Sequence, residues 1–233
     1  NQSSIQITGL SENMGKAMEI VEGLIAGAKP DEAILENLKG DMLKSRADAK
    51  LNQSRCFGAL QRYLFYGGDF IRRTTLTDPA LQALTSEQLL AKIGGLMGKQ
   101  HEVLYYGPQK ETEIKSALAE HHKVAADLQP LEKKFSALLP TDANKVVLAQ
   151  YDAKQLYYLQ FSNRGEKFDV AADPEITLYN EYFGGGMNTI VFQEMREARG
   201  LAYSAWATLA TPSNANGDYS YYAFIATQND KMQ

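Results

Sequence analysis

The stretch YFGGGMNTIVFQEMREARGLAYSAWA, residues 182–207, decides the fold prediction. Its three consecutive glycines, at 184–186, permit close backbone approach and positive φ angles. A helix with an apolar face follows them, and Gly200 then turns the chain into a strand. Arg196 lies near the end of that helix and Tyr203 near the start of the strand. The two side chains therefore flank one tight turn and are placed to converge on one ligand.

Two interpretations of Arg196 and Tyr203 are open at this point. In the first, Arg196 neutralises the negative end of the helix and Tyr203 is a half-buried aromatic residue of the strand. In the second, the guanidinium and the phenol act together as hydrogen-bond donors to a carbonyl group or to a developing oxyanion. The first makes the turn structural, and the second makes it a binding site.

Short strand-like runs, which either alternate apolar and polar residues or are rich in β-branched and aromatic residues, occur on both sides of this stretch. They are residues 3–8, 101–107, 145–150, 156–163, 202–210 and 218–227. Apolar residues repeat every seven positions over 31–65, which predicts one long helix that ends at Gly67 and Gly68. We predict an α+β fold with a mainly antiparallel sheet of about six strands and helices packed on one face. Residues 145–150 and 155–165 are expected to pair as a hairpin.

The two ends of the chain are similar to each other. IQIT at 5–8 and FIAT at 224–227 each precede a helix-capping residue, 219 positions apart. Two explanations of this similarity are open. Either it is common to any strand followed by a helix cap, or the chain is one period of a tandem repeat. Residues 127–144 contain prolines and show little periodicity, so this stretch is the best candidate for a linker or boundary within the chain. We expect 1–140 to be the back half of one repeat and 141–233 the front half of the next.

Composition excludes several classes of protein. The chain has 233 residues and a net charge of −4, which indicates a globular protein without a nucleic-acid footprint. A single cysteine excludes a disulfide framework and a Cys-rich metal site. No apolar run is long enough for a membrane span, and nothing indicates the compartment.

Only three histidines, His101, His121 and His122, are available for catalysis. HEVLY at 101–105 begins like the zinc motif H-E-x-x-H, but Tyr105 stands at the fifth position. The adjacent pair His121 and His122 points to different sides of a helix, so we expect a solvated face there. No residue of this chain is predicted to bind a metal.

The segments FGGGMNTIVFQEMREARGLAYS, 183–204, and, more weakly, GLSENMGKAMEIVEGLI, 9–25, resemble the insulinase, or pitrilysin, family of zinc metallopeptidases. The resemblance implies repeated α+β domains around a closed chamber. It also implies an H-x-x-E-H zinc motif in one half and, in the other, an Arg and a Tyr seven residues apart that reach the substrate. Arg196 and Tyr203 have this spacing, and the run Gly184, Gly185 and Gly186 matches the loop that faces the chamber.

The region where the resemblance would place the zinc motif, about 175–198, contains no histidine. The resemblance therefore implies the non-catalytic half of such a peptidase, inactive on its own and without a cofactor. Its Arg196, Tyr203 and three glycines would bind a peptide substrate. The zinc and the general-base Glu would belong to a catalytic domain of the same chain or of a partner chain.

Two other functions remain open. A purely structural scaffold domain of the same fold would use Arg196 and Tyr203 only for packing. An unrelated α+β binding module would be favoured if no H-x-x-E-H motif preceded this segment in the gene. Exposed edge strands at both ends also favour dimerisation or strand exchange of the isolated chain.

Overall fold

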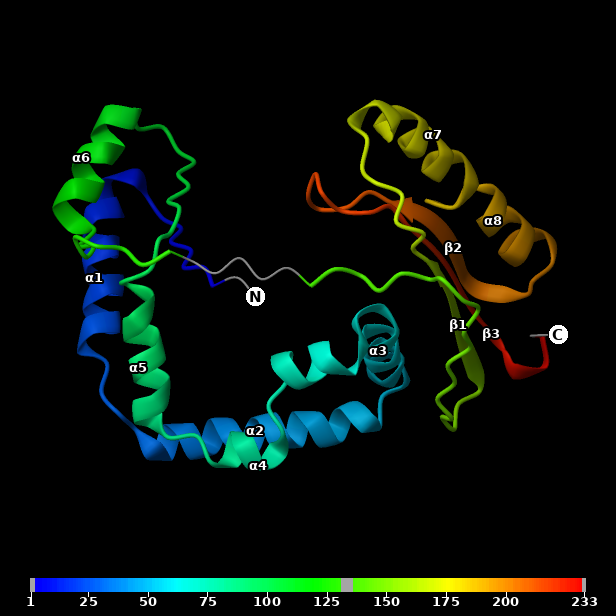
Figure 1. Cartoon of the computed structure of the whole chain (residues 1–233), viewed down its shortest axis with the longest axis horizontal. Coiled ribbons are helices and arrows are strands. Elements are labelled where there is room, and N and C mark those ends of the chain that lie inside the picture. Colours follow the sequence, from blue (N-terminus) through cyan, green and yellow to red (C-terminus); the bar gives the residue numbers. More distant parts are fainter. Residues whose placement is uncertain (1–2, 131–135, 232–233) are drawn as a thin grey trace. The chain divides into compact units, whose positions relative to one another are not determined.

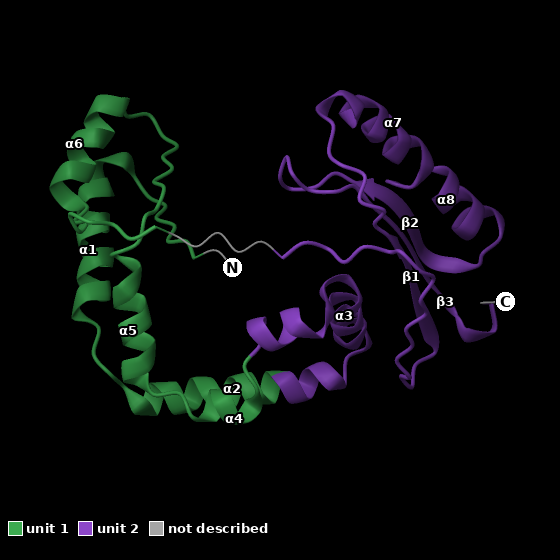
Figure 2. Ribbon diagram, in the orientation of Figure 1, with its two compact units in different colours: residues 1–45, 76–135 green, residues 46–75, 136–233 purple. Residues whose placement is uncertain are grey.

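The computed structural model of the chain describes residues 3–130 and 136–231. The chain forms two compact units, each assembled from separated stretches of sequence (Figure 2). Residues 1–45 and 76–135 make the helical unit, and residues 46–75 and 136–233 make the sheet unit. The first change of unit falls inside helix α2, Glu32–Lys50.

The helical unit contains no strand among its described residues. Its elements are the short turn η1 (Ser11–Asn13), α1 (Met14–Gly27), the first part of α2, α4 (Asp78–Gln82), α5 (Ser86–Leu96) and α6 (Glu111–His121) (Figure 1). Helix α1 packs against α5 and α6. Apolar residues repeat at helical spacing along α1, from Met14 to Ile25, and so lie on one side of the helix. Helices α5 and α6 partly cover that side.

Polar contacts join α2, α4 and α5 within the helical unit. A capping box at Thr85 opens α5. In the first turn of that helix, the N–H and Oγ of Ser86 donate to Glu32 of α2 at 2.8 and 2.7 Å. Lys39 is buried, and its Nζ donates to the carbonyl oxygen of Gln82 at 2.9 Å. A buried ammonium with such partners costs far less than an unpaired one, so these bonds fix the three helices together.

The sheet unit carries the order of elements expected around residues 182–207. Its elements are the end of α2, α3 (Gln53–Thr74), β1 (Gln155–Ser162), η2 (Val170–Ala172), α7 (Asp173–Phe183), α8 (Ile190–Phe192), the π-helical segment η3 (Gln193–Ala198), β2 (Ala202–Ala210), β3 (Ser220–Gln228) and η4 (Asn229–Lys231). The sheet has the order β1-β3-β2, and both pairs of strands are antiparallel. The predicted α+β class is confirmed.

Helices contact the sheet from both sides, so the prediction of helices on one face is wrong. The Phe57 ring of α3 lies 5.5 Å from the Tyr157 ring and 5.9 Å from the Phe224 ring. Gly184, at the end of α7, accepts a hydrogen bond from the Ala207 N–H at 3.3 Å. Phe224 is paired with Trp206, and Ala207 is the next residue of β2. The Ala207 side chain therefore points to the face of the sheet opposite to that of Phe224. Both rows of side chains are apolar, and both therefore need a cover.

The prediction of about six strands is also wrong, because the sheet has three. Among the described residues, the segments 3–8, 101–107 and 145–150 pair with no strand, and the expected hairpin of 145–150 is replaced by the pairing of β1 with β3. Their apolar side chains stand in solvent: Leu104 is 91% exposed and Val146 is 84% exposed. These segments have residues that suit a strand, but a strand forms only against a partner with free backbone groups.

The long helix predicted over 31–65 is interrupted at Asn52. Helix α2 ends at Lys50, and the side chain of Asn52 accepts from the Arg55 N–H at 3.0 Å to cap α3. The apolar heptad continues across this break and so conceals it. Gly67, expected to end the helix, has φ 76° and bends α3, which continues to Thr74.

The predicted boundary at 127–144 includes residues 131–135, which lie outside the described residues. On one side of them, the Gln129 N–H donates to the Gly98 carbonyl at 2.8 Å within the helical unit. On the other side, the Thr141 N–H donates to the buried Asn163 at its carbonyl, also at 2.8 Å, within the sheet unit. The division into half-repeats 1–140 and 141–233 stays a prediction.

Candidate functional site

The helix-to-strand turn between η3 and β2 forms as the sequence predicts. The N–H of Gly200 donates to the Arg196 carbonyl at 3.0 Å, and the N–H of Leu201 donates to the Met195 carbonyl at 2.9 Å. Gly200 has φ 57°, in the left-handed region where glycine is favoured because it lacks a Cβ. This turn ends the helix and sends the chain directly into β2.

Arg196 and Tyr203 meet across that turn. The guanidinium carbon of Arg196 lies 5.2 Å from the centre of the Tyr203 ring and 4.9 Å from the centre of the Phe192 ring. Both distances are within the range of a cation–π contact. The Arg196 Nε also lies 3.5 Å from Glu197 Oε1, and Tyr203 is 75% exposed. The two side chains are thus held side by side with their polar ends accessible to solvent.

Tyr203 occupies an irregular position in β2. Ala202 is opposite Thr227, and Ser204 is opposite Ala226, so Tyr203 is the extra residue between two consecutive pairs. An extra residue of this kind bends the strand and changes the direction of a side chain. The bulge therefore gives Tyr203 an orientation that a regular strand would not give it.

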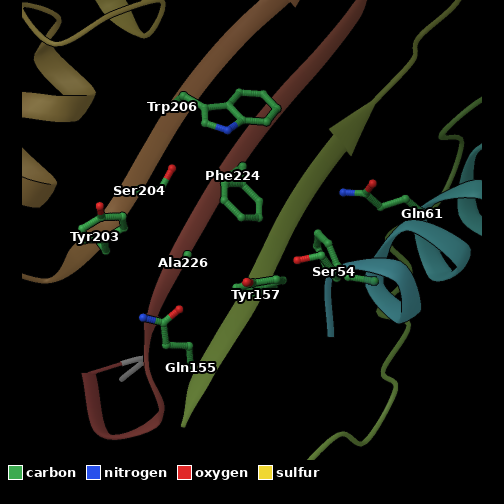
Figure 3. Close-up of a pocket in the computed structure, with 10 residues that line it drawn as sticks. Ser54, Gln61, Gln155, Tyr157, Tyr203, Ser204, Trp206, Phe224 and Ala226 are labelled. Atoms are coloured by element: carbon green, nitrogen blue, oxygen red, sulfur yellow. The ribbon is translucent and has the colours of Figure 1, made fainter. Parts of the chain in front are cut away.

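A pocket with a volume of about 550 Å³ lies beside Tyr203 within the sheet unit. It crosses the three strands, with Tyr203 at one side and Ser54 and Gln61 of α3 at the other (Figure 3). Its lining residues share one property, the absence of charge: Ser54, Phe57, Gln61, Gln155, Tyr157, Tyr203, Ser204, Trp206, Phe224 and Ala226. Such a lining suits an apolar or aromatic group with a few hydrogen bonds at the edge.

Stacked rings form the wall of the pocket. Trp206 stacks on Phe224 at 5.7 Å between ring centres, and Tyr157 meets Phe224 edge-on at 5.8 Å. We did not predict these aromatic residues as site residues. The two-residue period of the strands does place Trp206 and Phe224 on one face, but their cover by Phe57 of α3 joins residues far apart in sequence.

The three glycines have different surroundings. A Cβ on Gly184 would overlap the carbonyl oxygen of Ala207 in β2, and a Cβ on Gly185 would lie 2.8 Å from the carbonyl oxygen of Asn180. Nothing lies within 4 Å of a Cβ on Gly186. Gly184 therefore allows α7 to approach the edge of β2 closely, Gly185 allows the chain to fold back tightly on the end of α7, and only Gly186 has open space for a ligand. Their predicted role in substrate binding stays a prediction.

The edge of β2 is also held by Asn180. Its side-chain amide donates to the Leu209 carbonyl at 2.9 Å and accepts from the Leu209 N–H at 2.8 Å. This pair of bonds imitates a neighbouring strand, and it satisfies backbone groups at the sheet edge. The strand that carries Tyr203 is therefore also fixed near its far end.

The histidines are not on a solvated face, contrary to the prediction. At the end of α6, His121 Nδ1 lies 2.9 Å from Glu19 Oε1, and His122 Nδ1 lies 2.5 Å from Glu22 Oε1, both on α1. Within residues 3–130 and 136–231, no three His, Cys, Asp or Glu side chains converge as a metal site. A catalytic zinc takes three protein ligands, so the residues described do not fit one.

A comparison with protein families identifies the same relationship as the sequence motif. The profile described as the peptidase M16 inactive domain matches residues 100–233, more than half of the chain. The chain belongs to the peptidase M16 family. The resemblance to insulinase and pitrilysin is thereby confirmed, as is the assignment to an inactive domain of that family. None of the curated protein sequences matches the chain.

Two solved structures have a similar fold. One is the crystal structure of a peptidase M16 inactive domain from Pseudomonas fluorescens, with a TM-score of 0.68 and 17% sequence identity over 94% of this chain. The other is a protease from Helicobacter pylori, with a TM-score of 0.53 and 12% identity over 94% of this chain. The M16 chain spans about half of these proteins, 52% and 53% of their lengths.

Among the described residues, no helix of the M16 chain is both long and apolar enough to cross a bilayer.

Proposed function

We propose that this M16 inactive domain binds an extended peptide at the turn between η3 and β2, with Arg196 and Tyr203 as its donors. The observation that carries the proposal is the contact between the two side chains, 5.2 Å from guanidinium to ring, beside an uncharged aromatic pocket. Arg196 supplies N–H groups and Tyr203 an O–H, both suited to peptide carbonyls. The pocket would accept an apolar side chain of the same peptide.

The proposed chemistry of the site is electrostatic. In a peptidase that attacks a carbonyl carbon, negative charge develops on the carbonyl oxygen in the transition state. Donors held in place before the reaction stabilise that charge at little cost of reorganisation. The turn and the bulge hold Arg196 and Tyr203 in this way, because neither side chain relies on a flexible loop.

The zinc of the peptidase would be held by another domain. The three histidines of this chain lie at 101, 121 and 122 in the helical unit, and Arg196 lies in the sheet unit. The partner of this chain is therefore a catalytic domain, either in the same polypeptide or in a second one. Purified alone, with added ZnCl₂, the chain is expected to leave a peptide intact, and cleavage blocked by a chelator would refute this.

Peptide binding is directly measurable through Trp206, the single tryptophan of the chain and a residue of the pocket wall. A short synthetic peptide with one central phenylalanine between alanines and threonines serves as the probe. Titration is expected to change Trp206 fluorescence to saturation. Arg196→Ala and Tyr203→Phe are each expected to weaken binding roughly tenfold or more, because each removes a donor to the peptide backbone.

Arg199→Ala is the matched control. Arg199 ends the same helix, but its Nε lies 3.4 Å from Glu194 and it has no ring contact with Tyr203. The control is expected to bind the peptide as the wild type does. Equal binding by wild type, Arg196→Ala and Tyr203→Phe, with unchanged circular dichroism, would overturn the proposal.

The scaffold function has one specific observation in its favour. The Arg196 side chain contacts Phe192, Glu197 and Tyr203, which all belong to the same turn and the elements on either side of it. In a scaffold these contacts would stabilise the turn and nothing more. Arg196→Ala would then lower the thermal unfolding temperature, and the peptide would fail to change Trp206 fluorescence even in the wild type.

A further inference from the structure

The pocket beside Tyr203 contains polar side chains that have no partner in the protein. Ser54 and the half-buried Gln61 lie about two turns apart on α3, and both side chains point toward the strands (Figure 3). Within residues 3–130 and 136–231, neither side chain makes a hydrogen bond. Gln53 of the same helix, by contrast, donates its amide to the Gln155 carbonyl at 2.6 Å. The Gln61 amide and the Ser54 hydroxyl are therefore available to a ligand.

The side of the pocket formed by the strands is aromatic. Trp206 stacks on Phe224 with 26° between the ring planes, and Tyr157 meets Phe224 at 65°. Trp206 is 37% exposed, so part of its ring is not covered by the protein. An aromatic ring placed there gains apolar contact and also the favourable geometry of ring against ring. An aliphatic side chain would gain only the apolar contact, so this wall favours an aromatic occupant.

The occupant must also be neutral. All ten residues that line the pocket are uncharged. A carboxylate or an ammonium group would lose hydration on entering it and would meet no opposite charge, which is unfavourable. The pocket therefore suits an uncharged aromatic ring that carries a polar group able to reach α3.

We propose that this pocket selects a tyrosine side chain of the bound peptide, with the ring against Trp206 and the phenol hydroxyl at the Gln61 amide. The inference rests on the proposed function and adds the residue type that the site prefers. Tyr203 contacts Arg196 and also lines the pocket, so a peptide held at the turn has the pocket next to it.

The chemistry of the phenol group distinguishes tyrosine from the other aromatic side chains. A phenol hydroxyl both donates and accepts hydrogen bonds, and the side-chain amide of glutamine does the same. The two groups can therefore pair in either orientation of the amide. Phenylalanine has no polar group to offer, and the indole of tryptophan is a donor only. Gln61 is thus the residue that separates tyrosine from phenylalanine, and Trp206 is the residue that separates aromatic from aliphatic side chains.

Isothermal titration calorimetry with a series of peptides tests the preference. The peptides share the alanine and threonine frame of the phenylalanine probe, and their central residue is tyrosine, phenylalanine, leucine or glutamate. The wild type is expected to bind the tyrosine peptide roughly fivefold more tightly than the phenylalanine peptide, because one hydrogen bond is added. The glutamate peptide is expected to bind at least about tenfold more weakly than the tyrosine peptide.

Two variants assign the preference to named residues. Gln61→Leu is expected to bind the tyrosine and phenylalanine peptides equally, with the affinity for phenylalanine unchanged. Trp206→Leu is expected to weaken both aromatic peptides roughly threefold or more and to leave the leucine peptide within about twofold. Gln160→Leu is the matched control, since Gln160 is an exposed glutamine of β1 that does not line the pocket. It is expected to keep the preference of the wild type.

The outcomes separate this inference from the proposed function. Equal affinity of the wild type for the tyrosine and phenylalanine peptides would overturn the selectivity and leave peptide binding at Arg196 and Tyr203 intact. A tyrosine preference that persists in Gln61→Leu, with unchanged circular dichroism, would overturn the role of Gln61 in the same way. If no peptide of the series bound to the wild type, the proposed function itself would be refuted, and the selectivity with it.

Discussion

Residues 202–210 and residues 101–107 both have strand-like sequences but different structures. The first segment, β2, pairs with β3 along its length and carries Trp206 into an aromatic cluster. The second is extended and unpaired among the described residues, with Leu104 in solvent. The difference teaches that β-branched and aromatic residues favour an extended segment, whereas pairing depends on a partner strand with a matching face. The next four predictions test this contrast, from the largest expected effect to the smallest.

The close approach of α7 to β2 is expected to be the most sensitive point of the sheet unit. Gly184→Ala places a Cβ against the backbone carbonyl of Ala207, which a rigid paired strand cannot move. We expect a loss of about 3 kcal/mol in the free energy of unfolding, measured by urea denaturation followed through Trp206 fluorescence. Gly186→Ala has open space and is expected to change it by less than about 0.5 kcal/mol. Similar values for the two variants would contradict the packing role.

Removal of an apolar side chain distinguishes the paired from the unpaired segment. Phe224→Ala deletes a ring that contacts Phe57, Tyr157 and Trp206 and is expected to cost about 2–3 kcal/mol. Leu104→Ala, at a side chain 91% exposed, is expected to cost less than about 0.5 kcal/mol. The measurement is urea unfolding by circular dichroism. A large loss for Leu104→Ala would show that segment 101–107 is packed in solution.

Unpaired apolar segments are expected to drive self-association of the isolated chain, as the sequence also predicts. The double variant Leu104→Lys and Leu148→Lys, at positions 91% and 88% exposed, places charge on two such segments. Sedimentation velocity is expected to show less dimer than in the wild type. Val170→Lys, an exposed apolar position in a short helical turn, is the control and is expected to leave the dimer unchanged. A wild-type chain that sediments as a monomer would contradict this prediction.

The two units are expected to respond to opposite extremes of pH. In the helical unit the pKa of Glu22 is lowered, so its stabilisation is present above the ordinary Glu range, about pH 4, and is lost as pH falls below it. In the sheet unit burial raises the pKa of Tyr222, so the stabilisation is lost as pH rises above about 10. The thermal unfolding temperature measured across pH checks both directions. Glu22→Gln and Tyr222→Phe are the reference variants, and each is expected to show a weaker dependence of the unfolding temperature on pH in its own range. This is the smallest effect of the four.

Several predictions from the sequence are confirmed because their signals are local. The turn at Gly200 and the family motif of residues 183–204 depend on neighbours a few positions away. The errors concern long-range partners. They are the unpaired segments, the break at Asn52 and the second covered face of the sheet. Each of these features depends on the tertiary contacts that a segment makes.

The sequence by itself determined the α+β class, the family and the placement of Arg196 and Tyr203 on either side of one turn, because each follows from residue order and short-range geometry. Only the tertiary structure decided that the guanidinium lies over the phenol ring, that Gly184 packs on Ala207 and that His101 faces His122. These contacts join residues 7, 23 and 21 positions apart. Their geometry depends on a strand bulge, a sheet edge and the packing of α6 on α1, which no local pattern encodes.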